Sequence, residues 1–164
     1  MQKKVEWYLD FVDPKYKPAK DELTALFYFE PAAGVSTNEA MGRIASESST
    51  GTWTTLFTMP PRMKKLMAHA YERDGGFVKV AYPFDLWEPG NAPQLLSGIA
   101  GNIFGMKALD NLRLIDIQLP KEYLRHFSGP RHGMAGVRKM MNVYNRPLLG
   151  AVHKPKIGFS DVEH

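Results

Sequence analysis

The sequence predicts an α+β domain in which one antiparallel sheet carries helices on one of its faces. Three observations support this fold class. Apolar residues alternate with polar ones in several short segments, they recur at helical spacing in others, and proline or glycine separates the two kinds. In chain order the segments run strand, helix, strand, strand, helix, strand, with one extra short helix.

The first strand, helix and strand are expected between residues 21 and 58. Segment 21–29 predicts a half-buried strand, because its apolar side chains alternate with others along the chain. Ser36 and Glu39 have the spacing of a capping box, so a helix is expected to begin there. Gly51 is expected to end that helix, and 53–58 to form the second strand.

A short helix is expected after Pro60 and Pro61, because proline is favoured in the first turn of a helix. Its predicted apolar face consists of Met63, Leu66, Met67, Ala70 and Tyr71. Asp74, Gly75 and Gly76 are residue types that favour turns. They therefore separate this helix from a third predicted strand at 77–82.

The remaining elements follow from similar signals. Asn91 is a favourable N-cap for a second long helix. Segment 112–119 predicts the fourth strand, with Ile115, Ile117 and Leu119 expected on one face. Segments 121–127 and 133–144 are expected to be helical, and 147–156 to be a short apolar strand outside the sheet.

This order is that of the split βαβ, or ferredoxin-like, arrangement. We therefore predict three parts of the chain. Residues 1–20 form an irregular N-terminal arm, residues 21–128 form the ferredoxin-like domain, and residues 129–164 form a linker helix and the start of a further domain.

Composition limits the class of protein. The chain has 164 residues, 44% of them hydrophobic, which is enough for a packed core. It has no cysteine, which excludes a disulfide framework and a cysteine-ligated metal. Its net charge of +4 favours anionic partners. Because no signal-peptide or membrane-spanning pattern is present, we expect a cytoplasmic protein that does not enter a membrane.

One stretch, residues 47–55, combines hydroxyl side chains with a glycine, a carboxylate and a tryptophan. Hydroxyls and exposed backbone N–H groups suit a phosphate, and glycine permits close approach of the backbone. The alternative is a helix end rich in serine and threonine, with a half-buried tryptophan. The spacing alone leaves both interpretations open.

Three further residues are candidates for chemistry. Lys154 and Lys156 project to the same side of an extended segment, where each lowers the pKa of the other. The alternative is a pair of solvated surface lysines. Asn102 lies between glycines, where it is either a helix cap or an amide that holds a substrate or a metal-bound oxygen. The histidines show no metal-ligand spacing, so no metal site is predicted within the chain.

Four motifs together resemble the large subunit of ribulose-1,5-bisphosphate carboxylase/oxygenase (RuBisCO), in a style closer to the archaeal-type (form III) and related enzymes than to the plant form. They occur in the family's order and spacing, at residues 45–55, 101–109, 127–133 and 146–158. The resemblance implies an N-terminal ferredoxin-like domain followed by the first strand of a (β/α)₈ barrel, which the chain does not complete.

The resemblance also implies roles for the candidate residues. Thr52 and Trp53 match residues that hold one substrate phosphate. Glu47 matches a carboxylate that pairs with a lysine of a mobile loop, and Asn102 matches an amide near the magnesium ion and the substrate oxygens. In this family these residues serve the barrel of a second large subunit.

Two lysines complete the implied site. Lys154 matches the lysine that moves protons on the reacting carbons, and Lys156 matches its supporting neighbour. The family holds Mg²⁺ with a carbamylated lysine and two acidic residues on later barrel strands, which lie beyond His164. The chain alone is therefore expected to be inactive. The implied partners are ribulose 1,5-bisphosphate, CO₂ or O₂, a second large subunit, and possibly a chain carrying the rest of the barrel.

Two alternatives remain open. Val152 occupies a position where the family usually has threonine, which leaves a RuBisCO-like enolase or isomerase acting on a phosphosugar. An RNA-binding ferredoxin-like module needs exposed aromatic residues on its central strands. Segment 77–82 lacks the glycine–aromatic pattern of such modules, so no nucleic-acid partner is expected.

Overall fold

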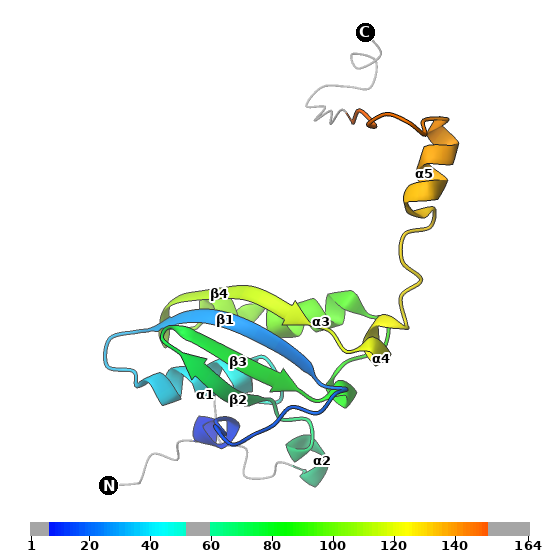
Figure 1. Ribbon diagram of the computed structural model, residues 1–164. Coiled ribbons are helices and arrows are strands. Elements are labelled where there is room, and N and C mark those ends of the chain that lie inside the picture. The colour runs from blue at the N-terminus through cyan, green and yellow to red at the C-terminus, as the bar shows by residue number, and fades with distance from the viewer. Residues whose placement is uncertain (1–6, 52–59, 151–164) are drawn as a thin grey trace, which may run out of the picture. The chain divides into compact units, whose positions relative to one another are not determined.

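The computed structural model describes residues 7–51 and 60–150 of the chain. Its centre is a four-stranded sheet with the order β2-β3-β1-β4, in which every neighbouring pair is antiparallel (Figure 1). The strands are β1 (Leu23–Pro31), β2 (His69–Asp74), β3 (Phe77–Tyr82) and β4 (Leu109–Gln118). This order confirms the predicted α+β fold class and the ferredoxin-like arrangement.

Helices complete the architecture, and the two longer helices of the sheet domain lie on the same side of the sheet (Figure 1). The α-helices are α1 (Thr37–Glu47), α2 (Pro61–Lys64), α3 (Ala92–Ile99), α4 (Lys121–Leu124) and α5 (Gly133–Met141). The 3₁₀-helices are η1 (Trp7–Phe11), η2 (Phe84–Leu86) and η3 (Asn102–Gly105). The chain divides into two compact units, Met1–Phe127 and Ser128–His164.

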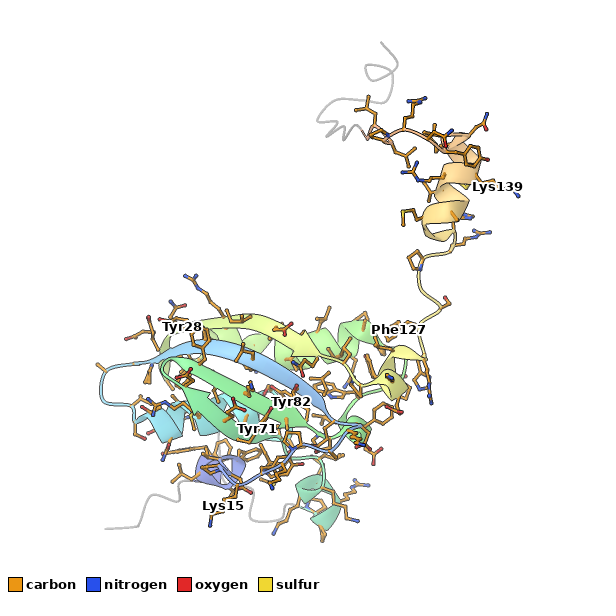
Figure 2. The ribbon with its side chains drawn as sticks, in the orientation of Figure 1. Lys15, Tyr28, Tyr71, Tyr82, Phe127 and Lys139 are labelled. Atoms are coloured by element: carbon orange, nitrogen blue, oxygen red, sulfur yellow. The ribbon has the colours of Figure 1, made fainter. Side chains whose placement is uncertain are left out.

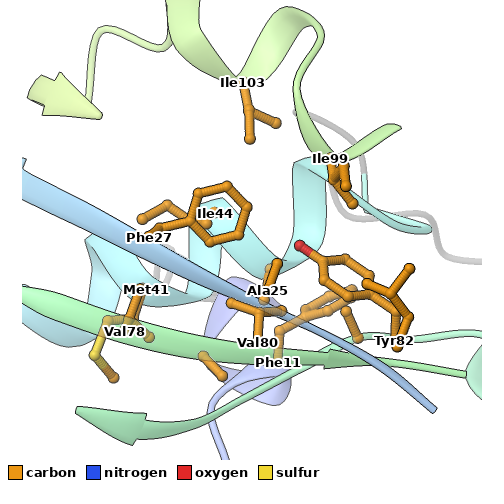
Figure 3. Packing of buried hydrophobic residues seen from close by; sticks show 14 of the residues in the cluster. Phe11, Ala25, Phe27, Met41, Ile44, Val78, Val80, Tyr82, Ile99 and Ile103 are labelled. Atoms are coloured by element: carbon orange, nitrogen blue, oxygen red, sulfur yellow. The ribbon is translucent and has the colours of Figure 1, made fainter. Parts of the chain in front are cut away.

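The core lies between the sheet and α1 and α3. The inward side chains of β1 are buried in strict alternation, as predicted, and they are Leu23, Ala25, Phe27 and Phe29. They pack in one cluster with Ile44 of α1 and Ile99 of α3 (Figure 3). Burial of this apolar surface is the main force that holds the helices on the sheet.

The predicted starts of the two longer helices of the sheet domain, α1 and α3, are confirmed by their N-caps. The Ser36 hydroxyl accepts a hydrogen bond from the Glu39 N–H at 3.1 Å, and α1 begins at the next residue, Thr37. The Glu39 carboxylate accepts from the Arg43 guanidinium, one turn along the helix, at 2.8 Å. The Asn91 side chain accepts from the Gln94 N–H at 3.0 Å at the start of α3.

The predicted helical segment that included Ala70 and Tyr71 was wrong. Helix α2 ends at Lys64, and Ala70 lies in β2, where it pairs with Val80 of the neighbouring strand β3. Ala68 and Ala70 are buried while His69 is only half-buried, which is the alternation of a strand. Alanine is compatible with both helical and strand periodicity, so the apolar pattern of this segment did not distinguish a helix from a strand. The strand predicted at 53–58 lies outside the described residues.

The predicted face of β4 was also wrong. The pairing of β4 with β1 skips Ile115, because Leu26 lies opposite Asp116 and Phe27 opposite Leu114. This bulge reverses the side on which later residues point. Ile115 is consequently 50% exposed, whereas Leu114 and Ile117 pack against the core.

The prediction that residues 1–20 form an irregular arm was wrong in part, because the described residues of the arm include the 3₁₀-helix η1. Among the described residues of this arm, η1 buries Tyr8 and Phe11. The chain then runs beside β2, where Val12 forms a parallel bridge with Ala70 and the Asp13 N–H donates to the Ala70 carbonyl at 3.0 Å. The arm therefore contributes to the core of the sheet domain.

The second unit contains α5, which is shorter than the predicted helix 133–144. It ends at Met141 because Asn142 adopts a left-handed conformation with φ of 52°. The Arg138 guanidinium donates to the carbonyls of Val143 and Arg146 at 3.2 and 3.1 Å, which fastens the chain after the helix. Residues 147–150 are not in a strand, and 151–156 lie outside the described residues. None of the helices in the described parts is long and apolar enough to cross a bilayer.

The contact between the arm and β2 is expected to weaken in acid. The His69 ring stacks on Tyr16 at 4.2 Å, and burial lowers the pKa of His69 although the Asp13 and Glu22 carboxylates oppose this. The unfolded chain therefore binds more protons, so the contribution of neutral His69 to stability is fully present above pH 6.5 and is lost as the pH falls from there through the lower pKa of the folded state. We expect His69→Phe to flatten this slope in thermal unfolding measured across the range.

Exposed His126 offers a matched control for this prediction. His126→Phe removes a histidine without touching the stacked pair, and it should keep the slope of the parent chain. An unchanged slope in His69→Phe would contradict the proposed origin of the acid sensitivity.

Candidate functional site

A cleft with several charged side chains lies beside one face of α1, where this helix meets the connection between η3 and β4. Its volume is about 230 Å³. The lining residues are Val35, Glu39, Arg43, Glu47, Met106, Lys107 and Ala108. Glu39, Arg43 and Glu47 are spaced four residues apart, which places them in one row along the helix. The structure thus places the predicted residue Glu47 in a charged cleft.

The charged side chains of the cleft differ in their surroundings. Arg43 is fixed by its ion pair with Glu39 at 2.8 Å and by the Tyr8 ring, which lies 4.8 Å beneath its guanidinium. Burial raises the pKa of Glu47, and the nearby Arg43 guanidinium offsets part of this rise. A further cation that entered the cleft would stabilise the charged form of Glu47.

Removing the Arg43 charge should change the ionisation of Glu47. In Arg43→Gln the burial remains and the opposing cation is lost, so we expect the pKa of Glu47 to rise above its value in the parent chain. NMR titration of the ¹³C-labelled glutamate carboxyl would measure this shift. Arg113→Gln, on an exposed position of β4, is the control and should leave it unchanged. A fall in the Glu47 pKa in Arg43→Gln would contradict the prediction.

The hydroxyls that follow Glu47 serve mainly the backbone. The Ser48 hydroxyl donates to the Ile44 carbonyl at 2.6 Å and the Ser49 hydroxyl to the Ala45 carbonyl at 2.7 Å. The Ser49 oxygen also accepts from the Ala68 N–H at 3.2 Å, just before β2. For these two serines the alternative of a structural helix end is therefore correct.

Gly51 turns the chain sharply at the end of this stretch. Its N–H donates to the Ser46 carbonyl at 2.7 Å, and a Cβ at this position would lie 2.4 Å from the Ser46 Cβ. Only glycine permits this approach. The next two residues, Thr52 and Trp53, lie outside the described residues, as do Lys154 and Lys156, so the structure places none of these four candidates.

Asn102 is the first residue of η3 and is exposed. The tight turn before it depends on Gly101, since a Cβ there would lie 2.1 Å from the Ser97 carbonyl oxygen. Ile103 is buried and anchors η3, which contacts α1. The cap of α3 is Ala100, so Asn102 does not cap this helix. It does not line the cleft of Glu47 either.

Lys107 is a cleft residue that sequence reasoning did not single out. It lies in the motif at 101–109, five residues after Asn102, and the turn after η3 brings it opposite α1. Its position in that motif was the available signal. Within residues 7–51 and 60–150 no group of three or more acidic or histidine side chains is placed to hold a metal ion. The described residues therefore do not fit a magnesium centre.

The fold and the cleft define a ferredoxin-like α+β domain with a cleft lined by charged side chains along its first helix. The family model described as "Ribulose bisphosphate carboxylase large chain, N-terminal domain" matches residues 10–123, and the chain belongs to this family.

Several ribulose bisphosphate carboxylases of archaea are similar to the chain. The chain is 59% identical to a ribulose bisphosphate carboxylase of Pyrococcus furiosus over 98% of its own length and 39% of that protein. It is 48% identical to the one of Archaeoglobus fulgidus, over 96% and 37%. The chain thus spans about two-fifths of the length of these relatives.

Solved structures agree with the sequence comparison. The octameric RuBisCO of Pyrococcus horikoshii superposes with a TM-score of 0.82 at 56% identity, over 95% of this chain and 38% of that one. The dimeric RuBisCO of Hyperthermus butylicus gives 0.82 at 50% identity, over 93% and 37%. At this identity the shared fold and the shared family are both secure.

Proposed function

We propose that the chain is the N-terminal part of an archaeal-type RuBisCO large subunit and contributes to the carboxylation of ribulose 1,5-bisphosphate. The observation that carries the proposal is the partly buried Glu47 in a charged cleft, directly before a sharp bend, in a chain 59% identical to a carboxylase. A carboxylate with a raised pKa gains most from a cation that arrives with the substrate. The mobile-loop lysine of a second large subunit is that cation in our proposal.

The residues after the bend bind one substrate phosphate in this proposal. Gly51 brings the backbone close to Ser46. Thr52 and Trp53 follow it directly in the sequence. A threonine hydroxyl and backbone N–H groups are suitable phosphate donors. Asn102, exposed at the start of η3, contributes its amide to the substrate oxygens.

Lys154 and Lys156 act on the reacting carbons in the proposal, the first by moving a proton and the second by supporting it. Mg²⁺ would polarise the substrate oxygens when it is bound. Its ligands are expected on the part of the barrel that the relatives have beyond the matched region, because the described residues offer no such cluster. The chain alone is therefore proposed to be inactive.

The proposed partner is a second large subunit, and the proposed compartment is the cytoplasm. One similar structure is described as octameric and another as dimeric, so assembly of large subunits is common to both. A separate chain that carries the remaining barrel strands is the other possible partner.

A chimaeric large subunit tests this function. In it, residues 1–164 of this chain replace the matching N-terminal part of the Pyrococcus furiosus carboxylase. We expect the chimaera to fix labelled CO₂ in the presence of ribulose 1,5-bisphosphate and Mg²⁺, and the 164-residue chain alone to fix none. A chimaera that folds and assembles but remains inactive contradicts the proposal.

Val152 keeps a RuBisCO-like enolase or isomerase as a second candidate. The same chimaera distinguishes the two, because an isomerase would consume the bisphosphate without incorporating labelled carbon. Val152→Thr should then raise the share of carboxylated product.

An RNA-binding function receives partial support from the sheet. Half-buried Tyr28 and exposed Phe77 form a T-shaped pair on the two central strands, with ring centroids 5.3 Å apart. However, Glu30 accepts a hydrogen bond from the Tyr28 hydroxyl, and Glu72 and Asp74 lie beside Phe77. These carboxylates repel phosphates, so we do not propose this function. A salt-sensitive mobility shift with single-stranded RNA would overturn that choice.

A further inference from the structure

A buried pair of hydroxyls joins the end of α1 to the centre of the sheet. The Ser48 and Tyr82 oxygens lie 2.8 Å apart, and both side chains are almost fully buried. Tyr82 is the last residue of β3, and Figure 3 shows its hydroxyl directed toward α1. Ser48 is the C-cap of that helix and the direct neighbour of Glu47.

The direction of this hydrogen bond follows from the second partner of Ser48. The Ser48 hydroxyl has one proton, and the Ile44 carbonyl at 2.6 Å receives it. Tyr82 is therefore the donor to the Ser48 oxygen. The result is a chain of two hydrogen bonds, from Tyr82 through Ser48 to the backbone of α1. Burial raises the pKa of Tyr82, so the donor keeps its proton at neutral pH.

The pair holds two parts of the proposed site at once. Glu47 precedes Ser48 on the chain, and the bend at Gly51 begins three residues after it. Ser49 fastens the same segment from the other side, through the Ala68 N–H at 3.2 Å. Movement of Ser48 would therefore shift both the carboxylate in the cleft and the start of the phosphate-binding bend.

Packing around Tyr82 leaves the hydroxyl little freedom. Its ring lies 5.5 Å from the Trp87 ring, which is buried as well. Tyr82 has no exposed surface, so bulk water cannot take the place of Ser48 as the partner of its hydroxyl. A buried hydroxyl pair whose hydrogen bonds go only to each other and to the backbone of α1 favours one geometry.

We propose that Ser48 and Tyr82 are positioning residues for the active site, which they serve by fixing the end of α1 and with it Glu47 and the bend at Gly51. This inference rests on the proposed function. A purely structural pair would affect stability alone, whereas a positioning pair also changes the kinetics of correctly folded enzyme.

The chimaeric large subunit with the Pyrococcus furiosus barrel provides the test. Tyr82→Phe removes one oxygen and keeps the ring, so the core remains filled. We expect kcat/KM for ribulose bisphosphate, counted per folded active site, to fall about tenfold, since small displacements of reacting groups are costly. Ser48→Ala should have a similar effect. The double variant should be no worse than the poorer single variant, because the two hydroxyls act as one unit.

Tyr28→Phe is the matched control. It removes the hydroxyl of a half-buried tyrosine on β1 (Figure 2), away from Ser48 and Tyr82, and it should leave kcat/KM unchanged. Values for Tyr82→Phe within about twofold of the parent overturn the inference. Losses that vanish after correction for the folded fraction overturn it as well, since they indicate a structural role. An inactive parent chimaera would instead refute the proposed function itself.

Discussion

Glu47→Gln in the chimaeric large subunit is expected to lower kcat by about 100-fold, the usual cost of misplacing one group at a reacting centre. Glutamine preserves the size of the side chain and removes its charge. The mobile-loop lysine would then enter the cleft without a carboxylate to hold it over the substrate. Labelled CO₂ fixation at saturating substrate measures the effect on kcat.

The same variant should be more stable than its parent near neutral pH. Burial raises the pKa of Glu47 in the folded state, so folding favours the protonated form. The stabilising contribution is therefore present below the ordinary value of 4.5 and is lost as pH rises through the folded pKa. At pH 7 the charged carboxylate costs stability, and glutamine avoids this cost.

Stability and activity together make this prediction specific. Thermal unfolding of the chain should show a higher Tm for Glu47→Gln near pH 7 and little difference near pH 4. Glu122→Gln, at an exposed position of α4, should change neither property. Loss of activity with a lower Tm at pH 7 would mean that Glu47 supports the fold, which contradicts the role proposed here.

The elements that were predicted correctly are those that local chemistry determines. The alternation of β1 and the caps at Ser36 and Asn91 depend on residues close in sequence. Two of the errors arose where tertiary pairing decides. β2 is a strand because β3 lies beside it, and the face of β4 depends on a bulge at Ile115. Neither the pairing of β2 with β3 nor the bulge in β4 can be recognised from the residues of one segment alone.

Part of the candidate site could also be predicted from the sequence. The resemblance to RuBisCO selected Glu47, and the structure places it in a charged cleft. The hydroxyls beside it were harder to assign, because a serine at a helix end can serve either a ligand or the backbone. Ser48 and Ser49 serve the backbone, which only the positions of Ile44 and Ala45 reveal. Lys107 lies in the motif at 101–109, but that motif did not indicate that the turn after η3 brings it to the cleft.

Gly51→Ala is expected to destabilise the domain by about 1–3 kcal/mol, the usual cost of overpacking a tight site. A Cβ here would lie 2.4 Å from the Ser46 Cβ and 2.7 Å from the Ser46 carbonyl oxygen. The oxygen belongs to the backbone of α1 and cannot swing aside as a flexible side chain can. The Gly51 N–H bond to Ser46, 2.7 Å long, must therefore lengthen or break.

The consequence for function separates Gly51 from an ordinary core glycine. Displacing the bend moves the attachment point of Thr52 and Trp53, so KM for the bisphosphate should rise in the chimaera even where the protein remains folded. Gly105→Ala is the matched control, because a Cβ there meets nothing within 4 Å. Its unfolding free energy in urea should stay within about 0.5 kcal/mol of the parent. If Gly51→Ala kept both its stability and its KM, the bend would tolerate movement, and it could not orient a phosphate-binding segment.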